Sequence, residues 1–131
     1  MLLLGSKYAV SEEEMVVWHD KIYNLAFECA CIKERHMFYL LLIWIYEFIE
    51  VSVVNNTGEH AGLAPIKRTY PLYEGALTNL FRLRCEFVHS PYKIDEARLL
   101  RFSSDRPAIN NVLCSLGFAK PVLNFEINYF Q

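Results

Sequence analysis

The stretch from Met37 to Val54 constrains the fold of this chain more than any other part of the sequence. It is apolar almost all the way round a helix and contains a ten-residue apolar run from Met37 to Tyr46. A membrane-spanning helix needs about 20 apolar residues with few charges, and Glu47 and Glu50 interrupt this stretch. We therefore expect a central helix, buried in a bundle or in a subunit interface, with partners for both carboxylates.

The length of 131 residues predicts a single domain, with its core over about residues 11–116 and a C-terminal tail at 117–131. Apolar residues make up 53% of the chain, which excludes intrinsic disorder. The tail alternates apolar and polar residues over 122–130 and is predicted as a strand or as an extended arm docked on a neighbour. The four cysteines lack metal-site spacing and no secretory signal opens the chain. We expect a cytoplasmic protein whose cysteines are reduced and buried, with no metal and no cofactor.

Helix signals recur along the chain and predict an all-α fold, an up-down bundle of four to five helices. Ser11 and Glu14 form a capping box at the start of the first helix. Residues 56–71 contain glycines and prolines and are predicted as a long functional or mobile loop. Pro107 and Gly117 bracket the last helix. The predicted helices span about residues 11–33, 37–54, 72–89, 95–102 and 107–116.

Charge is distributed unevenly along the chain. The net charge is −2, so bulk attraction to nucleic acid or to an anionic membrane is not expected. Residues 1–66 hold 4 basic and 9 acidic side chains, whereas residues 67–106 hold 8 basic and 5 acidic ones. An anion-binding surface would therefore come from the middle segment. There, Arg98, Arg101 and Arg106 either extend a binding groove or form an ordinary exposed helix face.

One arginine interrupts the apolar face of the helix predicted at 72–89. On a helical projection from Leu72, apolar residues occupy one half of the circumference and polar residues the other, but Arg84 falls about 120° round, in the middle of the apolar half. Because a guanidinium keeps its charge at neutral pH, Arg84 requires a partner. It is either buried in an ion pair with Glu47, Glu50 or Glu28, or held for a phosphate, which it would bind through two parallel hydrogen bonds.

The end of the same helix gathers further groups that suit a phosphodiester. His89 lies in the last turn, and histidine is the side chain most often used in acid–base catalysis at neutral pH. Arg82 lies about 20° from His89 on the same face, and Tyr92 follows two residues after Ser90. This set of two guanidiniums, an imidazole and a phenol fits an RNA phosphodiester better than a peptide or a hydride acceptor.

The segment from Arg84 to His89 reads R-x4-H at the end of an amphipathic helix in a small α-domain, and in this it resembles the HEPN superfamily. The resemblance implies a metal-independent endoribonuclease that acts as a homodimer, with the arginine and histidine of both chains facing one cleft. His89 would be the general acid or base, and Arg84 would hold the nonbridging oxygens while the RNA 2′-hydroxyl attacks phosphorus. Arg82, Tyr92, Arg98 and Arg101 would bind the RNA.

The resemblance also implies a biological setting, because HEPN proteins often serve as toxins, phage-defence factors or RNA-processing enzymes, some with a cognate antitoxin or nucleotidyltransferase. Two positions depart from the family pattern. Cys85 stands where the family usually has a polar residue, and Tyr92 lies one residue later than in the H-x-Y toxins. An inactive HEPN-like module for dimerisation or for binding RNA or a nucleotide is the alternative. A helical or membrane-associated accessory subunit is a third class.

Overall fold

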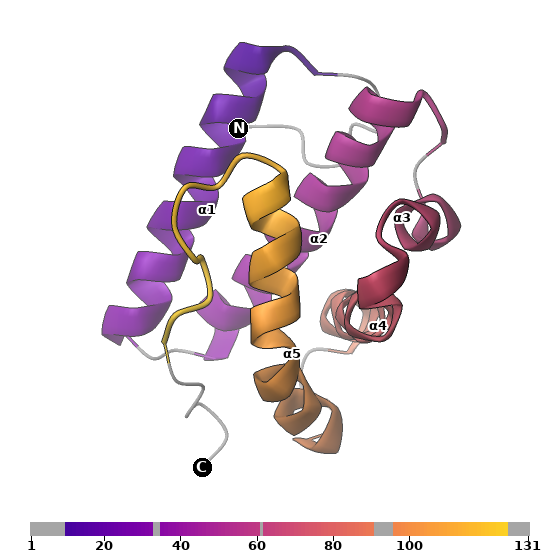
Figure 1. Ribbon diagram of the computed structural model, residues 1–131. Coiled ribbons are helices and arrows are strands. Elements are labelled where there is room, and N and C mark those ends of the chain that lie inside the picture. Colours follow the sequence, from indigo (N-terminus) through magenta and orange to yellow (C-terminus); the bar gives the residue numbers. More distant parts are fainter. Residues whose placement is uncertain (1–9, 33–34, 61, 91–95, 126–131) are drawn as a thin grey trace.

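Five α-helices and one short 3-10 helix form the parts of the chain that the computed structural model describes, namely residues 10–32, 35–60, 62–90 and 96–125. Figure 1 shows α1, α2 and α5 from the side and α4 nearly end-on, so α4 crosses the other long helices. The prediction of an all-α bundle of four to five helices is confirmed. In chain order, the elements are α1 (Glu12–Ile32), α2 (Arg35–Thr57), α3 (Leu63–Thr69), η1 (Pro71–Tyr73), α4 (Glu74–His89) and α5 (Glu96–Ser115).

The capping box predicted at the start of α1 is present. The Ser11 amide donates to Glu14 Oε1 at 3.3 Å, and the Glu14 amide donates to Ser11 Oγ at 3.2 Å. These two bonds satisfy amides that the first helical turn leaves without a partner. From this start, α1 packs against α2, with the Trp18 and Trp44 rings 5.1 Å apart between centroids in an edge-to-face arrangement.

Helix α2 is the central helix of the core, as its sequence predicts. It packs against α1, α3 and α4, and its buried residues run without interruption from Trp44 to Val53. By length and composition it could cross a membrane, but 78% of its most apolar 18-residue window is buried inside the molecule. Such burial is the arrangement of a core helix. It includes the Glu47 and Glu50 side chains, which are therefore held inside the bundle.

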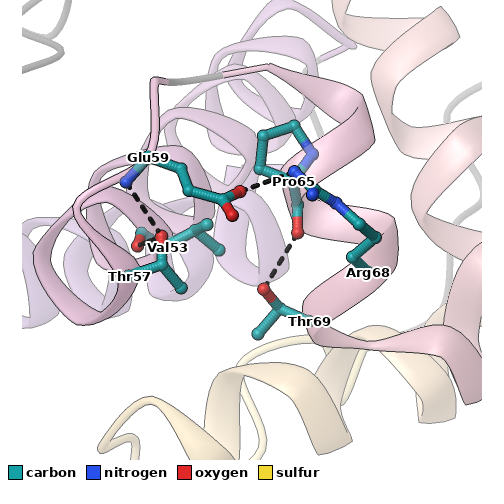
Figure 2. Close-up of polar contacts among 6 residues, drawn as sticks. All are labelled: Val53, Thr57, Glu59, Pro65, Arg68 and Thr69. Atoms are coloured by element: carbon teal, nitrogen blue, oxygen red, sulfur yellow. Dashed lines mark hydrogen bonds and ion pairs between the residues drawn. The ribbon is translucent and has the colours of Figure 1, made fainter.

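The prediction of a long loop at residues 56–71 is wrong, because this segment contains α3 and η1. Figure 2 shows how the α2–α3 connection is held. Thr57 Oγ1 donates to the carbonyl of Val53 at 2.7 Å, and Arg68 pairs with Glu59 at 2.6 Å. Pro65 lies in the first turn of α3, where a missing N–H costs no helical hydrogen bond. A helix this short is stabilised by burial, here of Ile66, which sequence periodicity over seven residues does not reveal.

The two helices predicted at 95–102 and 107–116 are in fact one continuous helix, α5, which contains Pro107. Proline in a helix interior leaves the carbonyl four residues earlier without its backbone donor. That carbonyl belongs to Ser103, and Arg106 Nε donates to it at 3.2 Å. The arginine side chain thus replaces the missing bond and lets the helix continue. Arg106 also donates to the carbonyl of Phe125, so it has a structural role and does not extend a groove with Arg98 and Arg101.

The described part of the C-terminal tail docks on its own chain and forms no strand up to residue 125. The Asn110 side chain accepts from the amides of Val122 and Leu123 at 3.1 and 2.9 Å and donates to the Leu123 carbonyl at 3.1 Å. Val122 and Leu123 are buried. Figure 1 shows this segment returning from α5 along α1. Residues 126–131 lie outside the described part of the chain.

All four cysteines are free thiols, but only one of them is buried. Cys29 is buried, Cys85 is half-buried, and Cys31 and Cys114 are exposed, so the expectation of four buried thiols is wrong. Burial, reinforced by the nearby Glu28 carboxylate, raises the pKa of the Cys29 thiol to about 12. This thiol therefore stays protonated and packs as a small apolar group.

Gly117 should be far less tolerant of substitution than Gly58, although both have positive φ. A Cβ at Gly117, where φ is +106°, would lie 2.8 Å from His19 Cε1, whereas a Cβ at Gly58, where φ is +70°, would meet nothing within 4 Å. Gly58→Ala should therefore cost only the left-handed backbone penalty, about 1 kcal/mol. Gly117→Ala should cost at least twice that in the free energy of unfolding, measured by urea denaturation. Equal losses would show that the His19 ring moves aside freely.

Candidate functional site

The rotation of α4 in the bundle divides its surface into a buried apolar side and a polar side. Leu77, Leu80, Leu83 and Phe87 are buried, and the Phe87 ring stacks on Tyr39 of α2 at 4.1 Å between centroids. This is the apolar half of the helical projection. The opposite half of α4 therefore faces α3, α5 and solvent.

Arg84, the exception on the apolar side, forms the ion pair that its position requires. Its Nη2 lies 2.6 Å from Glu47 Oε1 on α2, and the two side chains are 27% and 6% exposed. The guanidinium carbon also lies 5.8 Å from the centroid of the Tyr46 ring, within the range of a cation–π contact. Glu47 is one of the three carboxylates predicted as its partner, so the ion-pair prediction is confirmed.

The surroundings of this pair favour the charged arginine. Burial alone would lower the pKa of Arg84, but its hydrogen bond to Glu47 and the charge of that carboxylate raise it above its ordinary value. Burial, together with the charge of Glu50, also raises the pKa of Tyr46, so this phenol stays protonated. Arg84 Nε and Tyr46 Oη are buried and have no hydrogen-bond partner among the described residues.

The same geometry separates Arg84 from His89. Helix α4 continues to His89, so the two residues, five apart, lie about 140° apart round its axis. Arg84 points to the core, whereas His89 is exposed in the last turn. Within one chain, the structure does not bring the two predicted catalytic residues to one face. Arg82 and His89, seven apart, do share a face and are separated by about 10 Å along the axis.

The polar side of α4 forms one wall of an open groove of about 630 Å³. The opposite wall is the first part of α5, and α3 closes one end. The lining includes four cationic side chains from three helices. The residues that line this groove are Lys67, Glu74, Gly75, Thr78, Asn79, Arg82, Ala97, Arg98 and Arg101.

Two small or buried residues of α4 shape the groove. Asn79 is buried, and its amide donates to Asp105 Oδ2 at 3.0 Å, which ties α4 to α5. Arg101 crosses the first turn of α4 at Gly75, where a Cβ would lie 3.4 Å from Arg101 Nη2, an ordinary van der Waals contact. The position of α4 beside α5 thus depends in part on an uncharged residue, Asn79.

The four cations of the groove differ in whether a carboxylate already holds them. Lys67 Nζ lies 2.9 Å from Glu74 Oε1, and Arg98 pairs with Glu86. Neither Arg82 nor Arg101, both exposed, forms an ion pair with any described residue. The groove therefore has two guanidiniums available to an anion.

The predicted site residues fall into three groups. Arg82, Arg98 and Arg101 come together in the groove. Arg84 lies in the core contact and His89 at the exposed end of α4, and neither lines the groove. Tyr92 lies outside the described residues.

Sequence reasoning missed the contributions of Gly75, Thr78, Asn79 and Lys67 to this site. Asn79, Thr78 and Gly75 lie three, four and seven residues before Arg82 on the polar half of α4, and that stripe of small and amide residues is a usable signal. Lys67 was not placed with them because the segment that contains it was expected to be a loop.

No group of three or more metal-ligating side chains occurs within the described ranges. Comparisons of the chain with protein-family models, with curated proteins and with solved structures found no match. The chemistry of the groove is set by its own lining, which brings four cationic side chains to one surface.

Arg84→Met should destabilise the fold by about 3 kcal/mol, because it removes a cation that pairs with the buried Glu47 carboxylate. The double variant Arg84→Met/Glu47→Leu should recover most of that loss, since neither charge remains. Urea denaturation of the two single variants and the double variant would measure the coupling.

The exposed Arg68–Glu59 pair provides the control, because its side chains are 66% and 44% exposed. Arg68→Met should change the free energy of unfolding by less than about 1 kcal/mol. Losses at Arg84 no larger than those at Arg68, with additive behaviour in the double variant, would contradict the structural role of the Arg84–Glu47 pair.

Proposed function

We propose that this protein binds RNA through its phosphate backbone, in the groove between α3, α4 and α5. The observation that carries the proposal is the convergence of four cationic side chains on one open groove, with Arg82 and Arg101 free of carboxylate partners among the described residues. The R-x4-H resemblance of α4 to HEPN domains favours RNA among the possible phosphate ligands.

The chemistry of the two free arginines fits this ligand. A planar guanidinium can bind a phosphate through two parallel hydrogen bonds. Each phosphate that a cation neutralises also releases counterions from the nucleic acid, which makes the affinity fall as salt rises. The net charge of −2 does not oppose this, because the field that a ligand meets is set by the charges lining the groove.

The double variant Arg82→Ala/Arg101→Ala should weaken RNA binding at least tenfold at low salt. It should also reduce the slope of log affinity against log salt by about 1.4, the value for two lost phosphate contacts on a single strand. Fluorescence anisotropy with a labelled oligoribonucleotide would measure both quantities, and the same oligodeoxyribonucleotide would test preference for RNA.

Arg68→Ala is the matched control, since it removes an exposed arginine of α3 that does not line the groove. It should change affinity only slightly. If the double variant and Arg68→Ala bind RNA as tightly as the unaltered protein, the groove is not the RNA-binding site.

A second candidate function is metal-independent RNA cleavage, and the exposed His89 on the same α4 face as Arg82 favours it. In this reaction, a histidine takes the proton of the 2′-hydroxyl, the 2′-oxygen attacks phosphorus, and the 5′-oxygen leaves and is protonated. The products are a 2′,3′-cyclic phosphate and a 5′-hydroxyl. Arg84 of the same chain lies on another face, so a shared cleft in a homodimer would have to supply the paired arginine and the second imidazole.

His89→Ala should abolish such cleavage while RNA binding persists. The assay uses a labelled RNA with a chelator present and includes end-group analysis for the cyclic phosphate. His60→Ala, at an exposed position between α2 and α3, is the control and should cleave normally. Cleavage unchanged in His89→Ala would exclude His89 from the reaction. If binding occurs without any turnover, the protein is a binding module.

Because Arg84 also supports the fold, its role in catalysis is best tested in the Glu47→Leu background.

A further inference from the structure

Two of the four groove cations are already neutralised by carboxylates of α4. Glu74 holds Lys67 at the end of the groove near α3, and Glu86 holds Arg98 near the other end of α4. A phosphate that enters the groove would compete with these carboxylates for the same N–H donors. The free protein therefore offers less positive charge than the number of its basic side chains indicates.

The two pairs differ in how easily a ligand can displace them. The Lys67 and Glu74 side chains are 34% and 56% exposed, so water screens their attraction and both can move. The Arg98 and Glu86 side chains are 27% and 31% exposed, and one Glu86 oxygen is buried with no hydrogen-bond partner in the described part of the chain. Releasing Arg98 would leave Glu86 half-buried and unpaired, which is unfavourable. The Lys67–Glu74 pair is thus the one that a ligand can open.

The position of Glu74 makes this competition direct. It is the first residue of α4 and adjoins Gly75, over which the free Arg101 guanidinium lies. A phosphate bound by Arg101 would approach the place that the Glu74 carboxylate occupies, and repulsion between the two anions would favour the departure of Glu74. Lys67 would then become available to the ligand.

We infer that Glu74 is an internal competitor that keeps the groove partly closed to anions, and that RNA binding transfers Lys67 from Glu74 to a backbone phosphate. This inference rests on the proposed function, because it assigns a regulatory role to one residue of the same groove. Removing the Glu74 carboxylate should therefore strengthen binding, the opposite of what loss of a ligand-binding residue would do.

The test compares Glu74→Gln with Glu59→Gln in anisotropy titrations with a labelled 12-nucleotide oligouridylate. Both changes remove one negative charge, and Glu59 pairs with Arg68 outside the groove (Figure 2). Glu74→Gln should tighten binding several-fold more than Glu59→Gln at low salt. It should also steepen the salt slope by about 0.7, because one more cation contacts a phosphate of the single strand.

A second variant shows whether the gain passes through Lys67. Lys67→Gln/Glu74→Gln should bind RNA no more tightly than the unaltered protein, since the released cation is absent. Equal affinities and salt slopes for Glu74→Gln and Glu59→Gln would overturn the inference. If binding still depended on Arg82 and Arg101 in that case, the proposed function would stand alone. Failure of every variant to bind the oligonucleotide would overturn both.

Discussion

The contact between Arg84 of α4 and Glu47 of α2 is part of the core packing that fixes how α4 is rotated in the bundle, and the candidate site depends on that rotation. Both side chains are largely shielded from solvent there, and their pairing offsets the cost of burying the two charges. With Arg84 directed to the core, the polar half of α4 faces α3 and α5. The burial of Arg84 against Glu47 thus goes together with the position of Arg82 at the groove.

Local charge decides the character of the groove, and the carboxylates of α4 moderate it. Lys67 and Arg98 are partly neutralised by Glu74 and Glu86. The guanidiniums of Arg82 and Arg101, which pair with no carboxylate in the described part of the chain, therefore carry most of the accessible charge of the groove. Under the proposed function, such a surface would attract a polyanion without making the whole protein basic. A ligand would contact all of these cations only if it were long enough to span the groove, because they come from three helices.

Residue patterns of sufficient length predicted the structure well. The Ser11–Glu14 capping box, the buried α2 helix and the need of Arg84 for a partner all follow from spacing or from the cost of an unpaired buried charge. Prediction failed where a local signal was overridden. The glycines and prolines of residues 56–71 indicated a loop, but burial of Ile66 stabilises α3. Pro107 indicated a break, but Arg106 satisfies the carbonyl that proline leaves free.

By itself, the sequence determined the all-α class, the central place of α2 and the division of α4 into an apolar and a polar half, because these depend on periodicity along one helix. Only the tertiary structure decided which carboxylate holds Arg84, that Lys67 of α3 joins Arg82 and Arg101 at one groove, and that Arg84 and His89 point to different faces. The reason is physical. Distances between side chains of different helices depend on how those helices are rotated and crossed, and that is fixed by packing of the whole core.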